Sequence, residues 1–328
     1  MVNNMIQKVK SKVYVTMHIT GRCNIRCKHC FESSAIGGHI NKVFTDAKRE
    51  DVFNWLRQIA AAKCTGVSFV GGEPFLCLYD LIAYIKYAKE LGLQTTVITN
   101  GYWAESSESV DKMLDELSGL DSIVVSSDKY HLEFIDIETV DNLVNGCIRK
   151  NVQVSIHVTA ASNREGMEIK SLYTNRYSKP VQVLISPMFI WDSPHKIEVE
   201  KINFMEHPNL LKSHCNVNSP VVHADGNVHM CYGSLMLQTA SKEFFKLGNL
   251  AEETYENMMK MRNESLLYQF MNKYGPSGLA KIIKKSNLKD KFSEMEFSKD
   301  CQMCVWALDN KTFCDYFVDL LEKSKRTI

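Results

Sequence analysis

Three cysteines near the start of the chain are the residues with the clearest capacity for chemistry. Cys23, Cys27 and Cys30 stand at C-x3-C-x2-C spacing on one short stretch. Three thiolates this close together can bind three irons of a [4Fe–4S] cluster, which needs four ligands. The fourth iron is then open to a small molecule, as one position of a catalytic zinc is. A structural zinc site is the alternative, although such sites usually pair two C-x2-C units.

A second set of cysteines lies in the C-terminal third. Cys215 and Cys231 flank a segment, residues 221–230, whose apolar and polar alternation around Asp-Gly predicts a β-hairpin. The hairpin would bring these two thiols together, and Cys301 and Cys304 follow as a C-x2-C pair. Four thiolates fill every corner of a second iron–sulfur cluster, and a four-cysteine zinc site fits the ligand count equally.

The elements that must position the first cysteines form a regular alternation. Apolar, β-branched runs separated by helical periodicity predict six strands, at Val13–Thr20, Gly66–Val70, Leu93–Thr99, Ser122–Ser126, Val152–Val158 and Val181–Ile185. Strand and helix in turn indicate a parallel α/β fold. The polar motifs follow the strand ends, and in a barrel of parallel strands that edge is the catalytic face.

Composition limits the classes of protein to consider. The chain has 328 residues, is 45% hydrophobic and carries a net charge of +1. This suits one large domain, or one with a smaller companion, and argues against a nucleic-acid footprint across the surface. Neither a signal peptide nor an apolar run long enough for a membrane span is evident, so we expect a cytoplasmic protein. Eleven cysteines in such a chain indicate metal or redox ligands more than disulfides.

The cysteine triplet after a first strand, with Gly71-Gly72-Glu73-Pro74 one strand–helix unit later, resembles the radical SAM enzymes. The resemblance implies a partial (β/α)6 TIM-type barrel over residues 1–200, with Cys23, Cys27 and Cys30 as cluster ligands. It implies that S-adenosylmethionine (SAM) chelates the fourth iron. Reductive cleavage of SAM would then give a 5′-deoxyadenosyl radical that abstracts a hydrogen atom from the substrate.

The same resemblance assigns residues to SAM. Chemically, glycines let a backbone approach a ligand and a carboxylate accepts from an ammonium group. Turn chemistry and a buried core histidine are the plain alternatives at these positions. The cofactor-binding residues that the resemblance implies are His29, Gly71, Gly72, Glu73, Thr99, Asn100, Ser126, Asp128 and His157.

Residues 201–328 resemble the SPASM/twitch extension of radical SAM enzymes, a small domain of a β-hairpin and helices. The full SPASM form has further cysteines after the C-x2-C pair, whereas this chain has only Cys314 there. The departure favours the twitch form, with one auxiliary [4Fe–4S] cluster bound by Cys215, Cys231, Cys301 and Cys304.

The segments Phe69–Pro74, Thr99–Trp103 and Asp128–His131 together resemble radical SAM enzymes that modify ribosomally made peptides, the epimerases in particular. Within the last segment, His131 can exchange a proton near neutral pH, and Tyr130 can orient a substrate or pass an electron. Both are therefore candidate catalytic residues.

An epimerase must also return a hydrogen atom, for which a thiol is the natural donor. In the epimerases that this chain resembles, the donor cysteine directly follows the second hairpin cysteine, and that position is Tyr232 here. Cys314 is the predicted substitute, with Cys77 as a second candidate. Without a donor, the substrate radical would be oxidised to a crosslinked or dehydrogenated product.

Three functional hypotheses result. The first is epimerisation or crosslinking of a ribosomal peptide, with a flavodoxin- or ferredoxin-type electron donor. Little chain precedes the first strand, so we expect the peptide to be recognised by a separate leader-binding protein or by the barrel itself. The second is oxidation of a small molecule such as a sugar alcohol. The third is a zinc-stabilised binding protein, which metal analysis would separate from two cubes holding about eight irons per chain.

Overall fold

The computed structural model describes residues 13–30, 46–188, 215, 219–232, 245–295, 297 and 300–325. In these residues the strands form one nine-stranded sheet in the order β6-β5-β4-β3-β2-β1-β7-β8-β9. Strands β1 to β6 are parallel neighbours, which confirms the predicted parallel α/β pattern. Their bounds are β1 (Tyr14–Thr20), β2 (Gly66–Gly71), β3 (Gln94–Thr99), β4 (Ser122–Ser126), β5 (Gln153–Ala160) and β6 (Gln182–Pro187).

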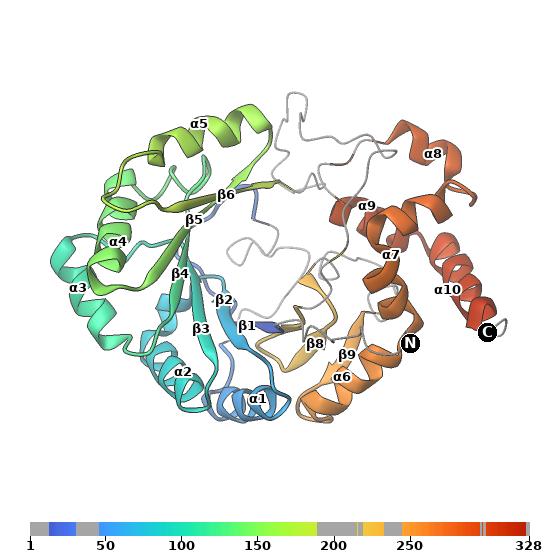
Figure 1. Cartoon of the computed structure of the whole chain (residues 1–328), viewed down its shortest axis with the longest axis horizontal. Helices are drawn as coiled ribbons and strands as arrows, with labels where there is room; N and C mark the ends of the chain where they lie inside the picture. Colours follow the sequence, from blue (N-terminus) through green and yellow to red (C-terminus); the bar gives the residue numbers. More distant parts are fainter. Residues whose placement is uncertain are drawn as a thin grey trace, which may run out of the picture.

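Helices cover the outer face of these six strands, so the sheet curves into an open, partial barrel (Figure 1). On β1, Val15, Met17 and Ile19 are almost fully buried and share one core with the apolar face of α1. Alternation along a strand sends the intervening side chains to the opposite, inner face of the barrel. The covering elements are α1 (Arg49–Ala61), the short 3₁₀ helix η1 (Pro74–Cys77), α2 (Leu78–Glu90), α3 (Ser107–Glu116), α4 (Ile137–Lys150) and α5 (Asn163–Tyr173).

The predicted hairpin joins this sheet directly. Strand β7 (Val221–Val222) pairs in parallel with β1, and β8 (Asn227–His229) returns antiparallel to β7. Gly226, in the predicted Asp-Gly turn, adopts φ +83°, which explains why glycine stands there. A further strand, β9 (Lys246–Asn249), pairs with β8. The hairpin of the predicted C-terminal unit thus extends the barrel sheet, and the predicted boundary at residues 200 and 201 lies outside the described residues.

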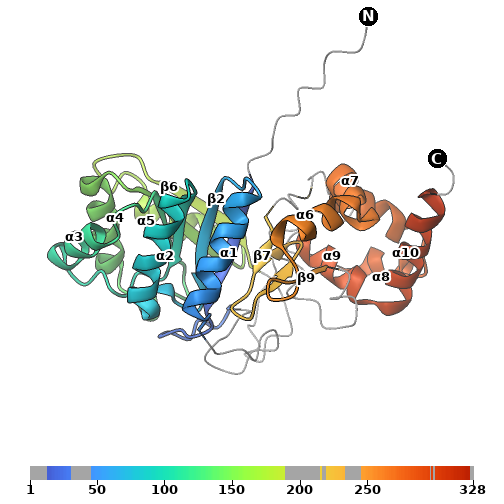
Figure 2. The same ribbon diagram turned by 90° about the horizontal axis from the view of Figure 1, so that it is seen from below.

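Five helices follow in the described residues. The first packs Tyr255 and Met258 into the barrel core, and the other four form a second core beside the barrel (Figure 2). Phe292, Phe313 and Phe317 are its largest fully buried side chains, and Val221 and Met230 of the hairpin region pack into it. The hairpin therefore contributes to both cores, because Val222 and Val228 belong to the barrel core. The helices are α6 (Tyr255–Glu264), α7 (Leu266–Ile283), α8 (Lys289–Glu294), α9 (Asp300–Asp309) and α10 (Lys311–Lys325).

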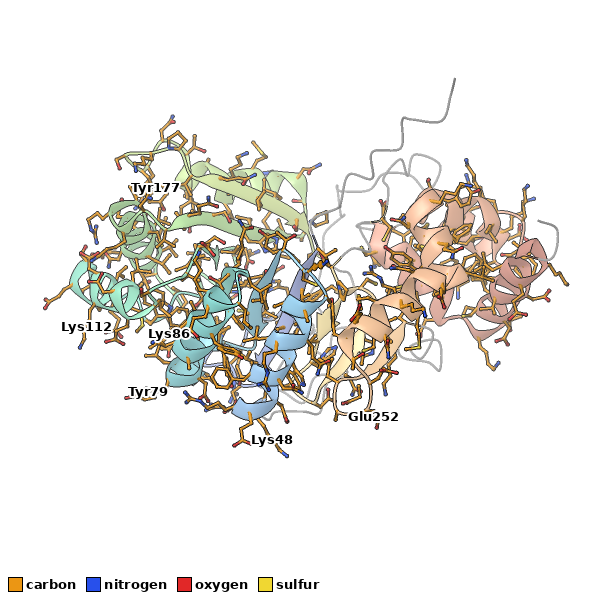
Figure 3. The ribbon with its side chains drawn as sticks, turned by 60° about the horizontal axis from the view of Figure 1, so that its bottom comes forward. Lys48, Tyr79, Lys86, Lys112, Tyr177 and Glu252 are labelled. Carbon is orange, nitrogen blue, oxygen red and sulfur yellow. The ribbon has the colours of Figure 1, made fainter. Side chains whose placement is uncertain are left out.

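Charged side chains lie on the outer surface of the covering helices. Lys86 of α2 and Lys112 of α3 point away from the sheet (Figure 3). Among the helices of the described residues, none is both long enough and apolar enough to cross a bilayer.

Candidate active site

The cysteine loop, residues 21–30, leaves the carboxyl end of β1 and carries the first three thiols. Cys27 is buried, Cys23 is half-buried and Cys30 is exposed. Burial raises the pKa of the Cys27 thiol well above its usual range, and negative charge on Cys30 and Asp128 raises it further. Metal binding offsets this penalty, because ligating thiols are deprotonated and the cation stabilises the thiolates. Three sulfurs on one loop are therefore a donor set that fits three corners of a [4Fe–4S] cluster.

Two glycines let the end of β2 lie directly against the cysteine loop. A Cβ atom on Gly71 would stand 2.1 Å from the carbonyl oxygen of Thr20, and one on Gly72 would stand 2.0 Å from that of Arg22. The N–H of Gly72 donates to Thr20 O at 2.9 Å, and that of Glu73 donates to Arg22 O at 2.7 Å. The close approach that the glycines allow is thus an approach to the loop, and their contact with SAM stays a prediction.

Glu73 is fully buried at the same strand end. Its Oε1 accepts from the N–H of Phe75 at 3.0 Å and from the hydroxyl of Thr99 at 2.8 Å, and its Oε2 accepts from the N–H of Asn100 at 2.8 Å. Burial raises the pKa of this carboxyl to about 7, an effect that the three hydrogen bonds only partly offset. Its carboxylate links the ends of β2 and β3, and acceptance from the ammonium of SAM stays a prediction.

Thr99 and Asn100 end β3 and also serve the loop. The Thr99 hydroxyl, besides donating to Glu73, accepts from the N–H of Gly101 at 3.0 Å, and the residue is 2% exposed. The Asn100 amide donates to Asn24 Oδ1 of the cysteine loop at 2.9 Å. Both side chains are therefore engaged within the protein, and Asn100 connects β3 to the cysteine loop.

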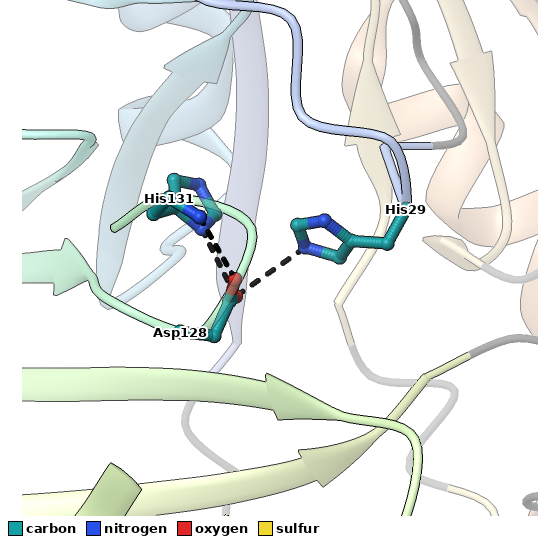
Figure 4. A group of neighbouring side chains, drawn as sticks. All are labelled: His29, Asp128 and His131. Atoms are coloured by element: carbon teal, nitrogen blue, oxygen red, sulfur yellow. Dashed lines mark hydrogen bonds and ion pairs between the residues drawn. The ribbon is translucent and has the colours of Figure 1, made fainter. Parts of the chain in front are cut away.

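Asp128, just beyond β4, connects a third strand end to the cysteine loop (Figure 4). Its Oδ2 lies 3.3 Å from His29 Nε2 and 2.9 Å from His131 Nδ1, and its Oδ1 accepts from the N–H of Tyr130 at 2.9 Å. Burial alone would raise the pKa of Asp128, but hydrogen bonds and positive charge from the two histidines outweigh it and hold the pKa well below its usual range. Asp128 is thus an anion that binds the loop through His29.

Tyr130 and His131 stand beside this contact. The Tyr130 ring stacks on that of His29 with 4.6 Å between centroids, and Tyr130 is 5% exposed. Burial, with nearby acidic groups, raises the pKa of Tyr130 to about 12, so it is a neutral phenol at pH 7. The geometry gives Tyr130 a packing role against the loop, and the catalytic roles of both residues stay predictions.

Ser126 and His157 are neighbours across β4 and β5 in the sheet register. His157 Nε2 lies 2.8 Å from the hydroxyl of Ser186 on β6. Both residues are half-buried, and their contacts with SAM stay predictions.

The second set of cysteines is brought together from three separate segments. Burial raises the pKa of Cys215 to about 12, and charge on Cys231 and Cys301 raises it further. Burial also raises the pKa of Cys304 well above its usual value, with added effects from the other three. Cys301 and Cys304 are three residues apart in α9 and so lie on one helix face. Four neighbouring thiols are a donor set that fits a fully ligated cluster.

Cys314, the predicted hydrogen-atom donor, lies in the C-terminal helices, and its role as donor stays a prediction. Cys314 is 3% exposed in α10 and packs into the C-terminal helical core. This helix lies at the side of the molecule farthest from β3 and β4 (Figures 1 and 2). Cys77 lies at the N-cap of α2, with its sulfur 3.3 Å from Arg22 Nη2.

Two features of the site were not predicted from the sequence. Arg22 of the cysteine loop binds Asp46 through both carboxylate oxygens, at 2.9 and 2.6 Å, and Asp46 also accepts from the Thr20 hydroxyl at 2.6 Å. The inner face of the sheet also carries His18 and His223, whose rings stack at 5.2 Å. Strand alternation places His18 of β1 on the inner face, but nothing in the sequence pairs it with the hairpin.

Two comparisons with known proteins concern only part of the chain. Residues 12–156 match the family model of a 4Fe–4S single cluster domain. A SAM-dependent nucleotide dehydratase from Lacinutrix mariniflava is 36% identical over 137 residues, which are 38% of this chain and 25% of that protein.

Two comparisons cover nearly the whole chain. The putative peptide biosynthesis protein YydG of Bacillus subtilis (strain 168) is 25% identical over 316 residues, covering 94% of this chain and 96% of that protein. The solved structure of anSMEcpe with bound AdoMet superposes with a TM-score of 0.57 at 14% identity, covering 96% of each chain. The latter likeness shows a common fold, partial barrel and C-terminal part included.

Proposed function

We propose that this chain, a radical SAM enzyme, abstracts a hydrogen atom from the Cα of a residue in a ribosomally made peptide and returns one to the opposite face. The observation that carries this proposal is the similarity to YydG, which extends through both the barrel and the C-terminal helices. The nucleotide dehydratases share higher identity, but only over part of the chain. The relative that matches along nearly the whole chain therefore favours a peptide substrate.

The chain's own residues supply a rigid support for the cofactors in this proposal. Cys23, Cys27 and Cys30 would hold the [4Fe–4S] cluster that binds SAM. The reduced cluster and its bound SAM together would supply hydrogen-atom abstraction. The cysteine loop is held by hydrogen bonds from the end of β2, by the amide of Asn100 and by the carboxylate of Asp128. Fixed positioning of this kind is what a reaction between two precisely oriented groups requires.

The auxiliary site belongs to the same proposal. Cys215, Cys231, Cys301 and Cys304 would hold a second [4Fe–4S] cluster with no iron left open, so that cluster would not bind SAM. Its proposed role is electron transfer and support of the C-terminal helices.

The test is an anaerobic assay of the iron-loaded enzyme with SAM, a reductant and peptides encoded beside its gene, in heavy water. The proposal expects 5′-deoxyadenosine together with a peptide that is one deuterium heavier and contains a D-residue. A peptide two hydrogens lighter would indicate oxidation or crosslinking and would exclude epimerisation. Turnover of nucleotides without any peptide product would instead support the dehydratase function, and the variant Cys27→Ala is the inactive control in each arm.

A further inference from the structure

Tyr232 occupies a distinctive place between the two cysteine sites. It directly follows Cys231, and it is 38% exposed although its ring stacks on a buried one. That ring belongs to His18, with centroids 6.0 Å apart and planes inclined by 26°. One face of the phenol ring is therefore held against the protein, while part of the side chain is exposed.

His18 tells which side of the barrel Tyr232 faces. Val15, Met17 and Ile19 of β1 lie in the outer core with α1, so His18 points to the inner face. The cysteine loop begins three residues after His18. Tyr232 thus lies on the inner face of the strand that delivers the first three thiols.

Buried imidazoles fix the position of this phenol. His18 stacks on His223 at 5.2 Å, and His223 meets His229 edge-on at 4.9 Å. All three histidines are 7% exposed or less. Packing against this layer fixes the orientation of the Tyr232 ring and of its hydroxyl group, as a functional group requires.

The thiols outside the two cysteine groups are poorly placed for the same task. Cys147 is fully buried in α4, and Cys314 is buried in α10. Cys64 precedes β2 at the barrel end opposite the cysteine loop, and the sulfur of Cys77 contacts Arg22. Tyr232 is, among the described residues, an exposed side chain at the inner face of β1 that carries a weak, exchangeable O–H bond.

We propose that Tyr232 is the hydrogen-atom donor that returns hydrogen to the Cα radical of the peptide. This inference rests on the proposed function. The phenolic O–H bond breaks homolytically, a new Cα–H bond forms on the face opposite the abstraction, and Tyr232 is left as a neutral phenoxyl radical. One electron from the low-potential reductant that the reaction already consumes, with one proton from water, restores the phenol. Each turnover then uses two electrons, one for SAM and one for Tyr232.

The test compares three variants of the iron-loaded enzyme in heavy water. Tyr232→Phe keeps the ring and removes the O–H, Tyr232→Cys supplies a thiol in its place, and Tyr274→Phe removes an exposed phenol of α7 as the matched control. We expect Tyr232→Phe to form 5′-deoxyadenosine in a peptide-dependent manner but to lose deuterium incorporation. Tyr232→Cys should regain incorporation, and Tyr274→Phe should match the parent enzyme.

A spectroscopic measurement is independent of product yield. Samples frozen during turnover should show a phenoxyl radical whose electron paramagnetic resonance spectrum narrows when the enzyme contains ring-deuterated tyrosine, and Tyr232→Phe should lack it. Full deuterium incorporation by Tyr232→Phe would overturn the proposal. So would a loss of 5′-deoxyadenosine that Tyr232→Cys does not restore, since that pattern marks a role in binding or folding. Failure of the parent enzyme to act on any peptide would instead remove the proposed function, and this inference with it.

Discussion

The two cysteine sites differ in how the chain holds their ligands. The three N-terminal thiols lie on one loop, and polar groups at the ends of β2, β3 and β4 bind that loop. The four C-terminal thiols come from separate segments that meet beside the apolar core of the C-terminal helices. In the first site the fold positions the three thiols, whereas in the second the proposed ligands come from parts of the fold that a bound metal would connect.

This difference has a consequence for each site. A loop supported by the partial barrel should lose a bound metal and leave the barrel core intact, since Val15, Met17 and Ile19 pack without it. A site that joins distant segments contributes binding free energy to folding itself. With the proposed clusters bound, we expect the first site to exchange a ligand at its open iron and the second to hold its metal permanently.

The largest expected effect separates the sites through stability. Cys304→Ala should destabilise α9 and α10 strongly, because metal sites that close a fold contribute on the order of 10 kcal/mol to folding. Cys27→Ala should abolish SAM cleavage and leave thermal unfolding nearly unchanged. Each variant should drop from about eight to about four irons per chain. Equal loss of helix content in both variants, measured by circular dichroism, would contradict the comparison.

Glu73 predicts a pH dependence at the barrel site. Its pKa rises from an ordinary 4.5 to about 7 in the folded protein, so the folded state holds its proton more tightly than the unfolded state does. The unfolded state therefore loses its proton first as pH rises, and stability falls by about 3 kcal/mol between pH 4.5 and 7, then levels off. Chemical unfolding at pH 5 to 8 should show this slope in the parent protein and a flatter one in Glu73→Gln. Parallel slopes would exclude Glu73 as its source.

Asp128→Asn should loosen the cysteine loop without unfolding the barrel. The change removes the negative charge that faces His29 and His131, and the loss of charged hydrogen bonds costs about 1–3 kcal/mol. We expect faster release of iron to a chelator, limited to the N-terminal site. Asp121→Asn, at the opposite end of β4, is the matched control because Asp121 accepts from Thr95 N–H far from the loop. Identical release rates in the two variants would show that Asp128 does not hold the loop.

The smallest effect concerns the exposed ion pair between Lys28 of the loop and Glu133. The two groups lie 3.2 Å apart, and both are substantially exposed. Such surface pairs contribute less than about 1 kcal/mol, so Lys28→Ala should change the iron-release rate little. A loss comparable with that of Asp128→Asn would mean that exposed charges, and not buried ones, support this site.

Much of the fold could be predicted because local signals and the tertiary structure agree. The strand predicted at Ser122–Ser126 has those bounds, and the hairpin turn lies at its Asp-Gly. The break between α6 and α7 is harder to predict, because Ser265 ends α6 and caps α7 through the Tyr268 N–H at 3.4 Å. The apolar periodicity continued through this break, and only the capping residue marked it.

The two groups of cysteines could be picked out from the sequence, whereas the residues that hold the cysteine loop could not, and the role of the cysteines as metal ligands stays a prediction. Cysteine spacing grouped the thiols because metal chemistry restricts that spacing. The contacts of Asp128 with His29 and of Arg22 with Asp46 depend on how the barrel curves, which no local pattern records. For the same reason no pattern in the sequence showed that Cys314 packs into the C-terminal helical core.

Isotope transfer can show whether the chain takes a hydrogen atom from the Cα of a peptide. The anaerobic enzyme would be given SAM, a reductant and gene-neighbouring peptides that carry deuterium at every Cα. We expect 5′-deoxyadenosine with one deuterium, formed only when the labelled peptide is present. Formation of 5′-deoxyadenosine without deuterium, at a rate independent of the peptide, would contradict this expectation.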